Sequence, residues 1–77
     1  MNFTIYTKSG CPNCVTAKLL LEFKGIGYEE MDFDDADVRT VFIRLYPEAR
    51  QMPQIFIEGQ RVGGLAGLQA AMKELGL

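Results

Sequence analysis

Apolar and polar residues alternate or recur at helical spacing along this 77-residue chain, and the two patterns divide it into predicted strands and helices. Residues 3–7 alternate and are rich in β-formers, which predicts a strand. A helix follows from Pro12, which suits the first helical position, to about Lys24, before the stop signals Gly25 and Gly27. Its apolar residues form more than one stripe, which predicts a helix that lies against a sheet: Val15, Ala17, Leu19, Leu20, Leu21 and Phe23.

The next stretch predicts a parallel crossover and a second helix. Residues 28–33 form a second predicted strand, and its acidic residues favour an exposed edge: Glu29, Glu30 and Asp32. Strand, helix and strand in so few residues imply a right-handed parallel connection. Asp34 or Asp35 then caps a helix that ends at Pro47. That helix carries a single apolar face: Val38, Val41, Phe42, Leu45 and Tyr46.

The last third of the chain predicts a hairpin and a third helix. Residues 54–57 and 60–62 pair around the turn Glu58-Gly59. Gly63-Gly64 opens a helix with one apolar face: Leu65, Leu68, Met72 and Leu75. The order βαβαββα predicts an α/β fold, a four-stranded mixed sheet with three helices on its two faces.

Composition and charge limit the classes of function. The 77 residues predict one domain, residues 1–77, and 48% hydrophobic with 23% charged residues argues against disorder. A net charge of -2 gives no reason to expect nucleic acid or an anionic membrane as a partner. No apolar stretch reaches the roughly 18 residues of a membrane span. Strand-like sequence from Phe3 leaves no room for a secretory signal, so we expect a cytoplasmic location. We also expect the protein to be a monomer.

Two cysteines carry the candidate chemistry. Cys11 and Cys14 lie at the predicted junction of strand and helix, within one helical turn. The helix dipole, backbone N–H groups and nearby Lys8 favour the thiolate of Cys11, which makes it the predicted nucleophile. Cys14, one turn further, is the predicted resolving thiol. Two purely structural cysteines are the alternative, but a disulfide across so short a loop adds little stability. The spacing therefore indicates a thioredoxin-like redox module.

The absence of histidine removes other chemistries. Zinc hydrolysis and catalysis by Ser-His or Cys-His pairs lose their usual residues. Two thiolates alone cannot complete a tetrahedral zinc site, so we expect no metal.

Four motifs give the chain a resemblance to the glutaredoxins over nearly its whole length. They are Lys8-Ser9-Gly10 before Cys11-Pro12-Asn13-Cys14, then Gln51-Met52-Pro53, then Pro53-Gln54-Ile55-Phe56-Ile57, and Val62-Gly63-Gly64 before the last helix. The resemblance implies a thioredoxin-like fold and dithiol–disulfide exchange with glutathione as co-substrate and reductant. It also implies disulfide-containing client proteins, with ribonucleotide reductase as a client by family analogy.

The resemblance further implies a glutathione site. A cis Met52–Pro53 peptide would place the Met52 backbone beside Cys11, where an extended peptide or glutathione pairs with it. Lys8 and Arg50 would meet carboxylates of the tripeptide, and the helix start at Gly64 would supply N–H groups. The implied glutathione-binding residues are Lys8, Pro12, Asn13, Arg50, Gln51, Met52, Pro53, Gly64, Leu65 and Ala66.

Two departures from the family pattern concern the electron donor. Leu65-Ala66-Gly67 stands where a polar segment with an Asp is common, and Asn13 replaces the usual aromatic residue. Residues 50–53 are similar to the small redoxins that serve ribonucleotide reductase and take electrons from thioredoxin reductase. That donor is therefore an alternative to glutathione. An iron–sulfur cluster held with glutathione between two subunits is a third alternative, against which Pro12 argues.

Overall fold

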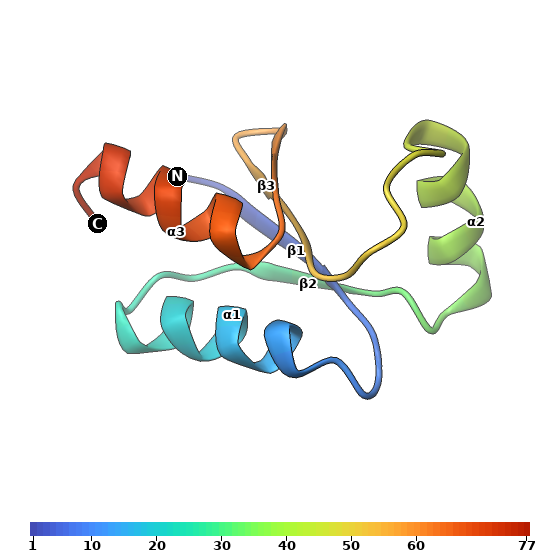
Figure 1. The fold of residues 1–77 in the computed structure, drawn as a ribbon, viewed down its shortest axis with the longest axis horizontal. Helices are drawn as coiled ribbons and strands as arrows, with labels where there is room; N and C mark the ends of the chain where they lie inside the picture. The colour runs from blue at the N-terminus through green and yellow to red at the C-terminus, as the bar shows by residue number, and fades with distance from the viewer.

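The computed structural model describes residues 1–77 and contains every predicted element in the predicted order βαβαββα. Figure 1 shows how these strands and helices are arranged. They are β1 (Phe3–Thr7), α1 (Pro12–Phe23), β2 (Glu29–Asp32), α2 (Ala36–Leu45), β3 (Gln54–Ile57), β4 (Gln60–Gly63) and α3 (Leu65–Leu75).

The four strands form one mixed sheet in the order β2-β1-β3-β4. β1 runs parallel to β2 and antiparallel to β3, so that Ile5 lies between Glu30 and Ile55. β3 and β4 form the predicted hairpin, and Glu58 and Gly59 at its turn both have positive φ, as a tight hairpin turn requires. β2 lies at an edge and is largely exposed, which agrees with its acidic composition.

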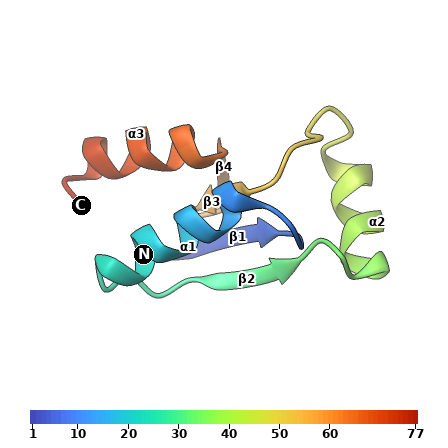
Figure 2. The ribbon, with the colours of Figure 1, turned by 60° about the horizontal axis from the view of Figure 1, so that its bottom comes forward.

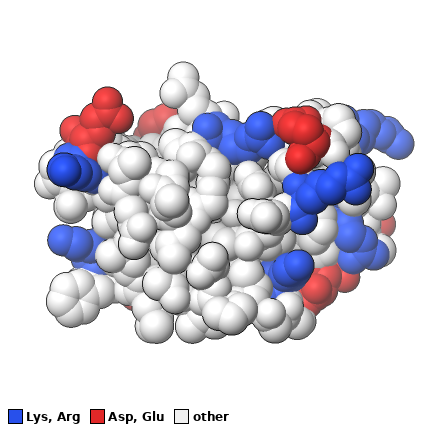
Figure 3. All heavy atoms as spheres, in the orientation of Figure 1, with Lys and Arg blue, Asp and Glu red and all other residues white.

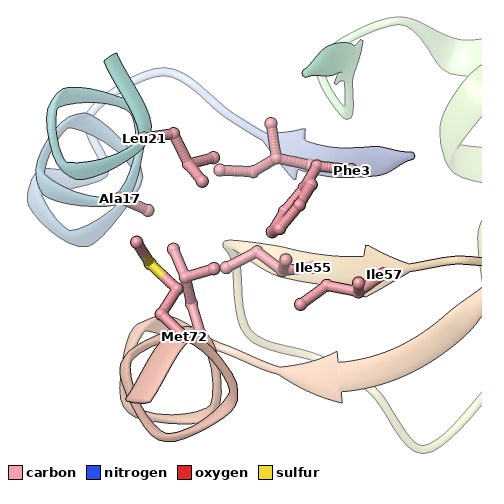
Figure 4. Packing of buried hydrophobic residues seen from close by; sticks show 8 residues of the cluster. Phe3, Ala17, Leu21, Ile55, Ile57 and Met72 are labelled. Atoms are coloured by element: carbon pink, nitrogen blue, oxygen red, sulfur yellow. The ribbon is translucent and has the colours of Figure 1, made fainter. Parts of the chain in front are cut away.

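Helices α1 and α3 lie side by side on one face of the sheet, and α2 lies apart from them at its far end (Figures 1 and 2). Between the sheet, α1 and α3 is a cluster of buried apolar side chains that point toward one another (Figure 4). Its members are Phe3, Ile5, Ala17, Leu21, Ile55, Ile57, Leu68 and Met72. Burial of each large member contributes about 1.5–3 kcal/mol, which makes this cluster the main source of stability.

The second face of the sheet holds an aromatic cluster beneath α2. Phe42 is 1% exposed, and its ring centroid lies 4.7 Å from that of Tyr6 and 5.2 Å from that of Tyr46. Phe33 and Phe56 complete the ring contacts. Asp35 begins α2 as predicted, because its side chain accepts hydrogen bonds from the N–H groups of the first turn.

Two predicted apolar faces are only partly covered. In α1, a stripe of three side chains is exposed to solvent: Val15, Leu19 and Phe23, at 54%, 58% and 88%. In α2, Phe42 is buried, but Val41 and Leu45 are 59% and 64% exposed. The expectation that the apolar residues of α1 lie against the sheet was wrong at Val15, Leu19 and Phe23, because the helix contacts the rest of the protein along one side only. The predicted apolar face of α2 is fully buried only at Phe42.

Gly67 on α3 lies where no side chain fits. A Cβ built at this position would be 1.9 Å from the carbonyl oxygen of Val62 on β4. Gly67→Ala should therefore lower the free energy of unfolding by about 1–3 kcal/mol, although alanine is the better helix former. Urea unfolding followed by circular dichroism measures the change.

Gly27→Ala is the matched control, because an added Cβ there meets nothing within 4 Å. We expect that variant to unfold at the wild-type urea concentration or above it. A Gly67→Ala protein as stable as Gly27→Ala would show that α3 moves away from β4 without cost.

Candidate active site

The two cysteines lie at the start of α1. Cys11 is the N-cap residue with extended backbone, and its sulfur accepts a hydrogen bond from the Cys14 N–H at 3.2 Å. The two Cα atoms are 5.2 Å apart, and the sulfurs form a disulfide. The dipole of α1 points its positive end at Cys11 Sγ, which stabilises a thiolate when the disulfide is reduced.

The surroundings of the two sulfurs differ. Cys11 is 7% exposed and Cys14 is 2% exposed, so Cys11 is the more accessible of the two. Gly10, which precedes Cys11, has a φ of 64°, a value that favours glycine at this turn. The Met52–Pro53 peptide is cis, as the resemblance implies, and the Met52 carbonyl oxygen lies 3.4 Å from Cys11 Sγ. The backbone of Met52 is thus within reach of any group bound to Cys11.

The loop before Cys11 is held by the loop before α2. Asp34 accepts hydrogen bonds from the side chain of Ser9 and from its backbone N–H, the latter at 2.9 Å. These bonds lower the pKa of Asp34 below its usual value. The side chain of Asp34 therefore holds Ser9 rather than capping α2, which settles the alternative that the sequence left between Asp34 and Asp35.

A groove of about 290 Å³ lies beside the cysteines, between α1 and the start of α3. Its lining comes from three separate segments of the chain: Asn13, Gln51, Met52, Pro53, Gln54, Gly64, Leu65 and Ala66. Of the predicted glutathione-binding residues, this groove brings together all except Lys8, Pro12 and Arg50. Leu65 and Ala66 add no side-chain hydrogen-bonding group to it.

A second, larger hollow adjoins this groove and shares Gln51 and Gln54 with it. We call it the basic hollow; its volume is about 680 Å³, and its lining is Glu48, Ala49, Arg50, Gln51, Gln54, Arg61, Val62 and Gly63. Arg50 lies here rather than in the groove. Figure 3 shows basic side chains on either side of an acidic one in the upper right of the molecule, and the centre of this face is uncharged.

Lys8 and Pro12 lie elsewhere on the surface around the cysteines. Lys8 lines a polar hollow beside Lys18 and Glu30, and Pro12 is exposed at the first position of α1. Hydrogen bonds from Thr7 Oγ1 at 2.6 Å and from Lys18 at 3.0 Å lower the pKa of Glu30. No three cysteine, aspartate or glutamate side chains gather in an arrangement that would hold a metal ion.

The sequence reasoning missed Gln54. This side chain is 9% exposed and lies at the junction of the groove and the basic hollow. Its Nε2 donates a hydrogen bond to the Gln51 carbonyl at 2.8 Å, which ties the Gln51 segment to β3. A polar residue at the start of an otherwise apolar strand was the available signal.

A dithiol at the start of a helix, packed on a βαβαββα sheet beside a cis-proline loop, defines a thioredoxin-like thiol–disulfide oxidoreductase. The family model described as Glutaredoxin matches residues 3–62. Glutaredoxin 3 of Escherichia coli is 38% identical over 69 residues, which cover 90% of this chain and 83% of that protein. The chain belongs to the glutaredoxin family.

Further similarities agree with this assignment. The crystal structure of glutaredoxin 1 from Francisella tularensis complexed with cacodylate is 34% identical, with a TM-score of 0.77. The alignment covers 99% of this chain and 98% of that one. The hybrid peroxiredoxin hyPrx5 of Haemophilus influenzae is 38% identical over 68 residues, and the chain spans only 28% of its length. No helix in this protein is both long and apolar enough to span a membrane.

Proposed function

We propose that this protein reduces protein disulfides and glutathione mixed disulfides and that glutathione is its electron donor. The observation that carries the proposal is the groove beside Cys11, which combines the Met52 backbone with the start of α3. A tripeptide in this groove pairs with the Met52 backbone as an added strand does. Its sulfur then lies beside Cys11, and one of its carboxylates meets the N–H groups at the start of α3.

Cys11 is the nucleophile in this proposal. Its thiolate attacks one sulfur of the substrate disulfide, and the other sulfur leaves as a thiolate. Either Cys14 or glutathione then attacks the Cys11 sulfur and releases the product. Its greater exposure and its N-cap position support Cys11 over Cys14 for the first step.

We assign the groove residues Asn13, Gln51, Met52, Pro53, Gly64, Leu65 and Ala66 to glutathione. Lys8, Pro12 and Arg50 flank the groove, and the two cations serve the carboxylates of the tripeptide by long-range attraction. We further propose a reducing compartment, the cytoplasm, because a dithiol donor works only where it is kept reduced. Ribonucleotide reductase remains a client by family analogy.

Thioredoxin reductase is the second candidate donor. Leu65 and Ala66 favour it, because neither side chain can bind the ammonium of a γ-glutamyl group. The two donors are separated by NADPH consumption in two coupled assays with the same disulfide substrate. One contains glutathione and glutathione reductase, the other thioredoxin reductase alone. Turnover only in the second assay would overturn the glutathione proposal and leave the dithiol chemistry in place.

A single substitution in the groove tests the orientation of glutathione. Ala66→Asp adds a carboxylate at the start of α3, where the γ-glutamyl ammonium lies in our proposal. The new contact is partly exposed and should strengthen binding by up to about 1 kcal/mol, so the KM for glutathione falls by up to about fivefold. Because salt screens such contacts, the fall should be larger at low salt than at moderate salt.

Ala70→Asp is the control, because Ala70 is exposed on α3 one turn beyond the groove. This variant introduces the same charge outside the groove, so its KM for glutathione should equal that of the wild type. A KM that Ala66→Asp leaves unchanged or raises at both salt concentrations would show that glutathione does not bind in this orientation.

A further inference from the structure

Of the residues that line the basic hollow, Arg50 and Gln51 were assigned to glutathione, whereas Glu48 and Arg61 have no part in the dithiol exchange. The hollow begins where the groove ends, at Gln51 and Gln54, and extends to Arg61 on β4. A polypeptide that pairs with the Met52 backbone and continues past Gln54 therefore enters it. A tripeptide that fills the groove leaves it open.

Arg61 is held in place on two sides. Its Nη2 donates to the Glu48 carboxylate at 2.8 Å, and its Cζ lies 5.1 Å from the centroid of the Tyr46 ring. A guanidinium fixed by an ion pair and an aromatic face loses little freedom when it binds another carboxylate. The remaining N–H groups of its planar fork are free to do so.

The charge of the hollow is positive although the chain as a whole is negative. Two arginines, Arg50 and Arg61, and one glutamate, Glu48, are the charged residues that line the hollow. Hydrogen bonds from the Glu48 backbone N–H and from Arg61 lower the pKa of the Glu48 carboxyl, which is therefore ionised at neutral pH. Arg50 forms no ion pair, so one cation in the hollow is uncompensated.

We propose that the basic hollow binds an acidic side chain of the client polypeptide, close to the cysteine that reacts with Cys11. Arg61 is then a residue that sets client specificity. The inference rests on the proposed reduction of protein disulfides at Cys11, and it places an extended client segment next to the Met52 backbone, where that proposal places glutathione. It does not depend on which donor later reduces the protein.

The reaction used for the test needs no donor. In the reduced protein the Cys11 thiolate attacks one sulfur of a client disulfide, and the second client sulfur leaves. Cys14 then attacks the Cys11 sulfur, forms the Cys11–Cys14 disulfide and releases the first client sulfur. Two electrons pass from the protein to the client, and both client sulfurs end as thiols after protonation.

Two peptides serve as clients, each with the same internal disulfide. One has glutamate residues beside its cysteines and the other has lysine residues. The pre-reduced protein is mixed with excess peptide, quenched with acid at successive times and analysed by mass spectrometry. The measured quantity is the single-turnover rate constant for the acidic peptide divided by that for the basic peptide. A variant that folds less well or has a less reactive thiol lowers both rate constants equally, so the ratio does not change.

Three variants share this readout. Arg61→Gln should lower the ratio by about two- to fivefold, the effect of one exposed ion pair. Glu48→Gln should raise the ratio, because the new amide oxygen can still accept a hydrogen bond from Arg61 while the negative charge that opposes an acidic client is lost. Arg44→Gln on α2 removes the same charge outside the hollow and should leave the ratio unchanged.

Two results would overturn the proposal. One is a ratio that Arg61→Gln leaves at the wild-type value. The other is an equal fall in Arg44→Gln, which would show attraction by the overall charge of the protein rather than binding in the hollow. A failure of glutathione to support turnover, by contrast, would alter none of these ratios.

Discussion

Cys11→Ser should reduce all disulfide exchange to the uncatalysed background. Cys11 holds the more accessible sulfur, at the N-cap of α1, and serine offers no thiolate at neutral pH. The loss should be equal for a protein disulfide and for a glutathione mixed disulfide, because both substrates react first at Cys11. Release of reduced product from each substrate is the measurement.

Cys14→Ser should separate the two reactions. Without the resolving thiol, a protein client remains bound to Cys11 as a mixed disulfide, so reduction of protein disulfides is lost. Glutathione from solution can still attack a glutathionylated Cys11, so some removal of glutathione from mixed disulfides remains.

Mass spectrometry gives the matching control, since Cys14→Ser should accumulate the client adduct and Cys11→Ser should accumulate none. An active Cys11→Ser protein beside an inactive Cys14→Ser protein would reverse the roles of the two thiols.

Phe42→Ala should lower the free energy of unfolding by about 3–5 kcal/mol, the usual cost of removing a buried phenylalanine. Phe42 is 1% exposed and contacts four aromatic rings between α2 and the sheet. A chain this short has a small margin of stability, so the loss is a large part of the total. Urea unfolding followed by circular dichroism measures it.

Phe23→Ala is the matched control for this loss. It removes the same ring from α1 at a position that is 88% exposed, and the stability should change by no more than about 0.5 kcal/mol. Equal losses of unfolding free energy in the two variants would mean that Phe23 is covered in solution or that the protein collapses into the cavity left by Phe42→Ala. The comparison therefore tests which of two predicted apolar faces is buried.

Much of the fold could be predicted because its signals are local. Alternation in residues 3–7 and helical spacing in α2 and α3 depend on side chains within two to four positions of one another. Other local signals restrict the backbone dihedral angles of a few adjacent residues, as at Pro12, Pro47 and the Glu58-Gly59 turn. The dithiol at the start of α1 belongs to the same class of signal, since one helical turn contains both cysteines.

The groove and the basic hollow could not be predicted from local signals, because their walls come from distant parts of the chain. The position of β3 between β1 and β4 brings the Met52 backbone to Cys11, and no spacing in the sequence encodes that contact. The family resemblance indicated the groove, yet it did not reveal Gln54 or the role of Arg61. Ser9 and Asp34, which hold the loop before Cys11, are also far apart in the sequence.

The sequence by itself therefore determined the elements, their order and the redox chemistry at the start of α1. Only the tertiary structure decided which apolar faces are covered, why position 67 has no room for a side chain, and where Arg50 and Arg61 lie relative to the groove. The physical reason is that propensity, caps and periodicity act over a few residues. Burial and binding surfaces instead depend on which segments the sheet order brings together.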